Sequence, residues 1–406
     1  MAYDEPGRAG SAEPVPGVPA AVLENVFDDP AHGEPGRDRV AVHLVWETVL
    51  LVSLVAVVLL LGREDADALR GDGLRTLLVD VVALGLLALA AGLSLRTAAV
   101  NLAVGPVAVA AALHFAEQGD RGAAAALTPA LLAAAVGGLA LALAVVVLHV
   151  PGWAASLAAA AGVIVYIERR TAPVAVQADY DPHRTAFYLF AGFAAVAVLG
   201  GVFGAIRAVR RVVGRFRPVA DPARRRGMVA ALVTAAALVG STVLAMLAGV
   251  LLAANAAGPV MPTSGLDWTL LAVGVAMLGG TSAYGRRGGI FGTLLAVGVV
   301  VVFLAWATTH GWTVGRWTVG GAALGAGLVV TRLVEACGRP RAATGEVAEF
   351  APAGDGMISS GWSLPRPSPA DNWPPALPAQ STGTPPDPWE APRWETGPRH
   401  WGADDR

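Results

Sequence analysis

The chain has 406 residues, of which 55% are hydrophobic and 15% charged; its mean hydropathy is +0.57 and its net charge is -2. Soluble domains carry about 25% charged residues, so this composition excludes an ordinary water-soluble protein and predicts an all-α, polytopic membrane protein. A single cysteine excludes an intramolecular disulfide and a cysteine-built metal site. All 29 basic residues are arginine and alanine is abundant, a coding bias that favours a bacterial source.

Both ends of the chain differ in composition from its middle. Residues 1–39 and 336–406 are rich in proline, glycine and acidic residues and poor in large apolar ones. Such segments cannot bury enough surface to offset the entropy of ordering, so we expect two disordered tails around a transmembrane domain at 40–335. The first apolar run starts after about forty polar residues and is too long for a signal-peptide core, so no cleavable signal peptide is expected.

Ten apolar segments are candidates for membrane helices, because a hydrocarbon core of about 30 Å needs about twenty apolar residues. In chain order they cover residues 40–61, 76–95, 98–115, 123–148, 153–167, 186–208, 228–257, 266–283, 290–309 and 314–333. The seventh segment would be about 45 Å long as a helix, so it must tilt, protrude or break. Its Gly240, Ser241 and Thr242 offer a small surface where another helix could approach closely.

The arginines predict the orientation of these segments. Loops on the cytoplasmic side are enriched in basic residues. With both termini in the cytoplasm, seventeen arginines up to residue 341 fall on the inner side, and the outer side holds eight: Arg63, Arg70, Arg75, Arg121, Arg169, Arg170, Arg184 and Arg316. We therefore expect a multi-pass protein of a bacterial plasma membrane with both ends inside.

No pattern in the sequence indicates catalysis. A phosphate-binding GxxxxGK[ST] loop needs a lysine, which this chain lacks, so any ATP hydrolysis is expected on a separate subunit. No histidine or cysteine spacing suits a metal, no cofactor is expected, and no basic and aromatic surface suits a nucleic acid.

A glycine-rich interruption between two apolar segments is the first candidate site. Residues 278–293 read LGGTSAYGRRGGIFGT, with six glycines and the adjacent Arg286 and Arg287. Non-helical backbone at membrane depth survives only where protein or a water-filled path covers it. The stretch resembles the GGTSLFGGRGSxxGT segment of the sugar-type permeases of ATP-binding-cassette (ABC) importers, the ribose and autoinducer-2 permease family. The matching positions are Gly279, Gly280, Thr281, Ser282, Gly285, Arg287, Gly288, Gly292 and Thr293.

A second stretch, AAVNLAVGPVAVAAAL at residues 98–113, is similar to the same family's GGIDLSVGxxxALxG segment. Leu102, Val104 and Gly105 match, whereas Asn101 stands where aspartate is usual and Ala103 where serine is usual. An intramembrane asparagine can hydrogen-bond across helices, so Asn101 is either part of the translocation path or a clasp between helices. Gly105 and Pro106 interrupt the run and could unwind the helix there.

The third stretch, VGRFRPVADPARRRGM at residues 213–228, lies where the family has a cytoplasmic loop that docks on the ATPase. Asp221 and Pro222 could open a short helix there, followed by Arg224, Arg225 and Arg226. The resemblance implies that these residues couple the protein to the ATPase. The alternative is that the arginines only hold the loop inside and contact anionic lipid.

The resemblance implies a permease subunit for a sugar or similar small polar solute. Its partners would be cytoplasmic ABC ATPase subunits, an extracellular solute-binding protein, a second permease copy and membrane lipid. The resemblance implies translocation-path candidates at Asn101, Gly105, Pro106, Gly279, Gly280, Thr281 and Ser282, and a cytoplasmic loop at Gly285, Arg286, Arg287 and Gly288. The two interrupted segments lie five spans apart, which an inverted repeat of spans two to five and seven to ten would produce.

Two alternatives remain open. An ion-coupled secondary transporter would need charged groups inside the membrane, and the apolar segments contain few: Glu47, Asp80, His114 and His149, all near predicted helix ends. A degenerate permease could act as a membrane scaffold or regulator that binds a partner through the tryptophans of the C-terminal tail: Trp362, Trp373, Trp389, Trp394 and Trp401.

Overall fold

The computed structural model describes residues 40–97, 99–177, 180–205, 228–282 and 290–336, together with 356–357 and 363–364. Contacts within the chain divide it into two units, residues 1–340 and 341–406. The first unit holds all ten of the described α-helices. In the second, the two-residue strands β1 (Gly356–Met357) and β2 (Ser363–Leu364) pair antiparallel.

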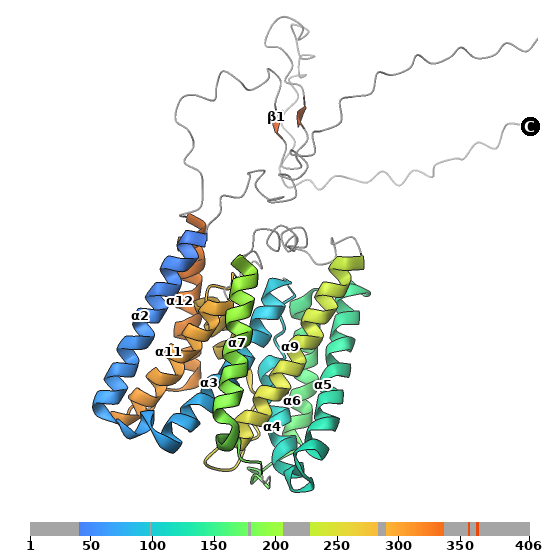
Figure 1. The fold of residues 1–406 in the computed structure, drawn as a ribbon. Coiled ribbons are helices and arrows are strands. Elements are labelled where there is room, and N and C mark those ends of the chain that lie inside the picture. Colours follow the sequence, from blue (N-terminus) through green and yellow to red (C-terminus); the bar gives the residue numbers. More distant parts are fainter. Residues whose placement is uncertain are drawn as a thin grey trace, which may run out of the picture. The chain divides into compact units, whose positions relative to one another are not determined.

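The helices of the first unit run alternately up and down in Figure 1. They are α2 (Val40–Glu64), α3 (Gly71–Arg96), α4 (Val104–Gln118), α5 (Ala123–Val146), α6 (Gly152–Glu168), α7 (Ala186–Ala205), α9 (Met228–Ala254), α10 (Leu266–Leu278), α11 (Ile290–Thr309) and α12 (Arg316–Ala336). Short 3₁₀ turns, η1 (Asp67–Leu69), η2 (Gly119–Arg121) and η3 (Pro182–Thr185), lie between them. We call the end where α2, α4, α6, α9 and α11 finish the lower end, and the opposite end the upper end.

Each apolar segment predicted from the sequence overlaps one helix, but six of the described helices are long and apolar enough to span a bilayer, so the predicted count of ten spans is not confirmed. Two differences in the extent of the helices are informative. Helix α4 begins at Val104, so residues 99–103 of the predicted span 98–115 are not helical. Helix α9 runs without a break over 27 residues, about 40 Å at 1.5 Å per residue. It crosses the bundle obliquely (Figure 1), so tilt rather than a break accommodates its length.

The described helices are those of a membrane protein. Six are long and apolar enough to span a bilayer, and α6 and α10 are shorter apolar helices. The outer faces of α2, α5 and α7 carry exposed large apolar side chains, among them Val52, Leu132 and Leu199. Ten hydroxyl-bearing side chains from Ser94 to Thr293 are instead buried. This distribution suits a bilayer, where apolar surface faces lipid and polar groups turn inward.

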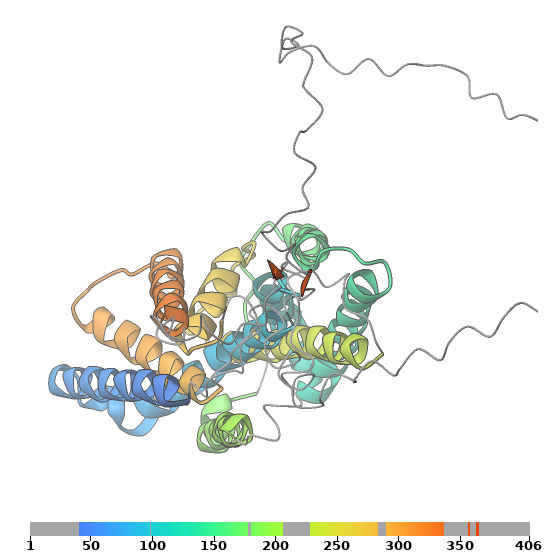
Figure 2. The ribbon, with the colours of Figure 1, turned by 90° about the horizontal axis from the view of Figure 1, so that it is seen from above.

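Helices α3 and α9 form the centre of the bundle. They pack on each other, α9 also contacts α4 and α5, and α3 contacts α10, α11 and α7. Viewed along the helices in Figure 2, α2, α11 and α12 lie on one side of this central pair and α5 and α6 on the other. Helix α10 packs most extensively on α12, and α4 contacts α6.

Small residues bring these helices close together. A Cβ on Gly138 of α5 would lie 2.2 Å from Thr242 Oγ1 of α9. The Thr242 hydroxyl also donates to the carbonyl oxygen of Ala134 at 2.9 Å. On the other face of α9, a Cβ on Gly249 would lie 2.0 Å from the Ala108 carbonyl oxygen of α4. Of Gly240, Ser241 and Thr242, the residues predicted to allow another helix to approach, Thr242 makes such a contact with α5. Close backbone contact takes the place of a hydrophobic driving force between helices in lipid.

Candidate functional site

The two shortest described α-helices, α4 and α10, start inside the bundle with their first turns against each other. Helix α4 runs from there toward the lower end, where Glu117 pairs with Arg170, and α10 runs to the upper end, where Trp46 meets its last turn. Each follows a long helix, α3 or α9, after a non-helical segment. Two half-helices of opposite direction thus share one bundle layer, and their positively polarised N-terminal ends converge.

Gly105 and Gly265 make this contact geometrically feasible. A Cβ on Gly105 would lie 1.9 Å from the carbonyl oxygen of Gly265, and one on Gly265 would lie 2.6 Å from the carbonyl oxygen of Gly105. Gly265 also has φ = 73°, a left-handed conformation that favours glycine. Pro106 sits in the first turn of α4, where a missing N–H costs no helical hydrogen bond. The predicted interruption at Gly105 and Pro106 is therefore a helix start.

Thr269 of α10 bridges the two half-helices. Its hydroxyl accepts a hydrogen bond from the Gly105 N–H at 3.0 Å and donates to the Leu102 carbonyl oxygen at 3.1 Å. The Gly105 N–H is one of the first amides of α4, which have no partner within their own helix. Thr269 thus satisfies backbone groups that would otherwise be unpaired at membrane depth.

The segment before α4 is held by side chains of two further helices. Asn101 is fully buried; its Nδ2 donates to Ser241 Oγ of α9 at 3.0 Å, and its Oδ1 accepts from the Ala103 N–H at 3.0 Å. Ser156 of α6 donates to the Val100 carbonyl oxygen at 2.8 Å. Both ends of the Asn101 amide are thus engaged within the protein, which is the geometry of a clasp between helices.

The upper end of α10 contains the described part of the glycine-rich stretch. A Cβ on Gly279 would lie 2.7 Å from the backbone of Thr293, so the chain leaves α10 in direct contact with α11. Gly280 has φ = 95°, while Thr281 and Ser282 are buried. Helix α2 covers this turn, since Trp46 Nε1 donates to the Leu278 carbonyl oxygen at 2.7 Å.

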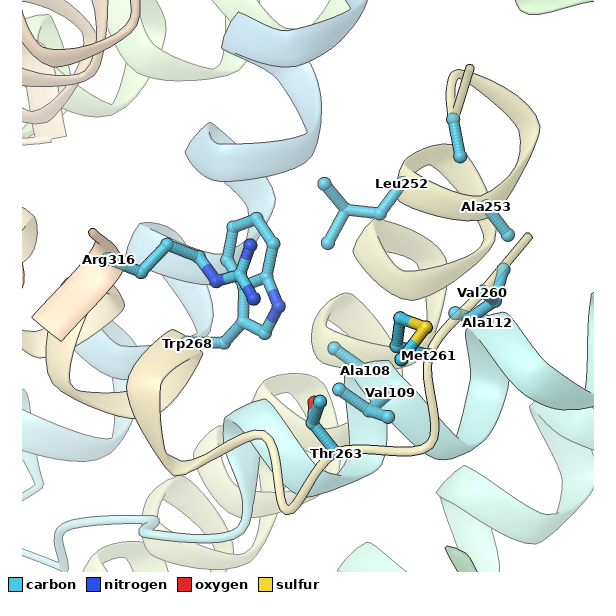
Figure 3. A pocket seen from close by; sticks show the side chains of 11 residues that line it. Ala108, Val109, Ala112, Leu252, Ala253, Val260, Met261, Thr263, Trp268 and Arg316 are labelled. Carbon is cyan, nitrogen blue, oxygen red and sulfur yellow. The ribbon is translucent and has the colours of Figure 1, made fainter. Parts of the chain in front are cut away.

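A cavity of about 200 Å³ lies on the lower side of the crossing (Figure 3). Its walls come from α4, the end of α9, the segment between α9 and α10, and the first turns of α10 and α12. The lining residues are Ala108, Val109, Ala112, Leu252, Ala253, Ala256, Val260, Met261, Thr263, Trp268 and Arg316.

Arg316 and Asp267 form an ion pair at this cavity that the sequence did not predict. Arg316 Nε donates to Asp267 Oδ2 at 2.5 Å, and the guanidinium carbon lies 4.7 Å from the centre of the Trp268 ring. The two residues are 49 positions apart, so sequence spacing could not join them. The available signal was an acidic residue next to a tryptophan at the start of an apolar segment.

Two other polar pairs tie helices together near the lower end. Asn255, the residue just after α9, donates through Nδ2 to Asp80 Oδ1 of α3 at 2.7 Å. Glu117, beyond the apolar part of α4, accepts two hydrogen bonds from Arg170, at 2.6 and 2.8 Å. The Arg170 contact holds the pKa of Glu117 below its usual value, and the same hydrogen bonds raise the pKa of Arg170.

The structure therefore brings Asn101, Gly105 and Pro106 together with the start of α10, and places Gly279, Gly280, Thr281 and Ser282 at the opposite end of that helix. The predicted cytoplasmic residues Gly285, Arg286, Arg287 and Gly288 lie outside the described residues, as do the predicted coupling residues Asp221, Pro222, Arg224, Arg225 and Arg226. No family model, no curated protein and no solved structure matches this chain.

Proposed function

We propose that this protein is a transmembrane permease subunit, and that it works in an ABC importer of the sugar-type family that its sequence resembles. The observation that carries the proposal is the meeting of α4 and α10 through Gly105 and Gly265. Discontinuous helices whose N-termini meet inside a bundle are a recurring construction of membrane transporters, where they surround the substrate path. A protein whose helices served only as a membrane anchor would not need discontinuous helices.

The arrangement of helices also supports an inverted repeat. Helix α3 leads to the short α4, and α9 leads to the short α10. Helix α9 packs on α4 as α3 packs on α10, and α4 contacts α6 as α10 contacts α12. This is the pairing expected if α3–α6 and α9–α12 are equivalent, although α2 and α7 do not follow it. In the proposed mechanism, movement of one half against the other opens the crossing alternately to each side.

In this proposal the upper end faces the cytoplasm of a bacterium. All eight arginines assigned to the outer side belong to described residues, and they lie at the lower end. ATPase subunits would bind at the upper end through the segment that contains Asp221 and Pro222. A binding protein would deliver solute to the lower end, and a second permease copy would complete the assembly. ATP can shift the equilibrium between the two states, in which the crossing is open to one side or to the other, only if it binds them with different affinities.

Co-purification tests this proposal. Full-length protein is isolated from its native membrane, and bound ATPase activity is measured for the wild type and for Arg224→Ala/Arg225→Ala/Arg226→Ala. The matched control is Arg207→Ala/Arg210→Ala/Arg211→Ala, which removes equal charge from the end of the predicted span 186–208 and the start of the same loop. We expect an ATPase that co-purifies with the wild type and with the control variant but not with the Arg224/Arg225/Arg226 variant. Absence of an ATPase from the wild type would reject the importer. Equal loss of ATPase activity in both variants would reject a specific coupling role for Arg224, Arg225 and Arg226.

An ion-coupled transporter is the second candidate, because Asp80 is hydrogen-bonded to Asn255 between the two central helices. It predicts solute uptake that depends on an ion gradient without ATP and that is lost in Asp80→Asn. A scaffold or regulator predicts neither kind of uptake and a partner that binds the C-terminal tail. Uptake into vesicles, with ATP or an ion gradient supplied separately, distinguishes the three functions.

A further inference from the structure

The cavity beside the crossing has one polar corner. Arg316, Trp268 and Thr263 are the lining residues with hydrogen-bonding side chains, and Figure 3 shows the guanidinium end of Arg316 and the indole nitrogen of Trp268 on the cavity side. The side chain of Arg316 is 45% exposed although Asp267 holds its Nε. Among the described residues, no hydrogen bond occupies its two terminal nitrogens. The corner therefore offers mainly donors.

The rest of the wall is apolar. Eight of the eleven lining residues are alanine, valine, leucine or methionine. A hydroxyl that is buried against such a wall without a partner costs about 1–3 kcal/mol. A sugar carries hydroxyls around its whole ring, so only those near Arg316 and Thr263 would be satisfied. The lining does not fit a polyol.

The lining also distinguishes between acids. The guanidinium of Arg316 and the indole N–H of Trp268 are hydrogen-bond donors, so they suit a ligand group that only accepts hydrogen bonds. A carboxylate is such a group. None of the eleven lining residues is acidic, and Arg316 already engages the neighbouring Asp267, so the lining offers the ammonium group of an amino acid no unengaged carboxylate. The volume of about 200 Å³ is below the roughly 300–1,000 Å³ of pockets for drug-sized ligands, so the solute must be small.

We propose that this cavity binds a small monocarboxylate with a compact apolar body and no ammonium group. Its carboxylate contacts the terminal nitrogens of Arg316 and its alkyl part lies against α4 and the end of α9. The inference rests on the proposed transport function for its biological meaning, and it changes the expected solute class from sugar-like to carboxylate.

The test is equilibrium binding to the full-length protein in lipid nanodiscs. The probes are 4-methylpentanoate, its uncharged analogue 4-methylpentanamide, leucine, which adds only an ammonium group, and ribose. We expect 4-methylpentanoate to bind at least tenfold more tightly than each of the other three. Equal or tighter binding of ribose or leucine, or no binding of 4-methylpentanoate at millimolar concentration, would overturn the proposal.

Variants locate the bound acid. Arg316→Gln should weaken the binding of 4-methylpentanoate at least tenfold. Arg184→Gln, which removes an exposed arginine at the same end of the bundle, should leave this binding unchanged. Because loss of the Asp267 partner could disturb folding, Ala256→Leu provides a second variant: this exposed position lines the cavity, and the larger side chain should block it. Unchanged binding in Ala256→Leu would place the acid elsewhere.

The two proposals fail separately. Binding needs no ATPase, so specific binding of the acid without an ATPase partner would reject the importer alone. ATP-driven uptake of a different solute, with no binding of the acid, would reject the cavity assignment alone.

Discussion

The backbones of Gly105 and Gly265 touch where α4 and α10 begin, so that a Cβ on Gly105 would lie 1.9 Å from the carbonyl oxygen of Gly265. The two glycines are 160 positions apart in the sequence, at the starts of helices that run in opposite directions. The proposed permease function depends on this contact, because it joins two short helices into one layer of the bundle.

Gly105→Ala should destabilise the protein by about 1–3 kcal/mol, because the new methyl group meets backbone that cannot move aside as a side chain could. The matched control is Gly162→Ala in α6, where a Cβ would meet nothing within 4 Å. That change should be neutral or stabilising by up to about 1 kcal/mol, because alanine favours the helix. Unfolding of both variants in mixed micelles measures the difference, and equal stabilities would contradict the contact.

Asn101 and Ser241 should show an energetic coupling of about 0.6 kcal/mol and at most about 1.7 kcal/mol, the average and the maximum measured for hydrogen bonds between membrane helices. The double-mutant cycle uses Asn101→Ala, Ser241→Ala and the double variant, each unfolded in micelles. Asn101→Ala alone should cost more than Ser241→Ala, because it also leaves the Ala103 N–H without its partner. A coupling of zero would show that the amide does not join the segment before α4 to α9.

Glu117 should make stability depend on acidity. Arg170 lowers the pKa of Glu117 in the folded protein, so the ion pair stabilises fully above the usual value of 4.5 and is lost as the pH falls below it through the folded pKa. Both side chains are partly exposed, so the contribution is about 1 kcal/mol. When unfolding is measured between about pH 3 and 7, the free energy of unfolding should fall more steeply toward acid pH for the wild type than for Glu117→Gln. Parallel curves would contradict this prediction.

Trp46→Phe should lower the free energy of local opening at the upper end of α10 by about 0.5–1.5 kcal/mol, the usual net contribution of one hydrogen bond. The ring remains, but the N–H that reaches the Leu278 carbonyl oxygen is lost. Hydrogen exchange of the amides in α10 and the start of α11 measures the effect. Trp153→Phe, at an exposed position of α6, is the control and should leave this exchange unchanged.

The apolar segments were enough to predict where each helix lies, because a run of about twenty apolar residues has few alternatives in a bilayer. They could not show that α4 begins at Val104, since its start depends on Thr269, Ser156 and Ser241 of three other helices. The same holds for Asn101, because its hydrogen bond to Ser241 joins residues 140 positions apart in the sequence.

The cavity was beyond prediction for a related reason. Its polar corner joins Arg316, which the sequence placed among the outer arginines, with Trp268 and Asp267 at the start of another helix. Only the packing of α10 on α12 brings them together, and that packing depends on backbone contact between Gly274 and Gly320. Small residues occur along both of these helices, so the sequence alone could not identify α12 as the helix that packs on α10.

Labelling of single cysteines tests the central claim most directly, namely that the crossing of α4 and α10 borders a path that opens and closes. In a Cys337→Ser background, Val109→Cys lines the cavity, and Ala116→Cys is a buried control on the same helix outside the lining. We predict that a membrane-impermeant maleimide applied from outside labels Val109→Cys at rates that differ at least tenfold with and without a non-hydrolysable ATP analogue, while Ala116→Cys stays unlabelled. Equal rates at Val109→Cys under both conditions, or no labelling in either, would contradict the account.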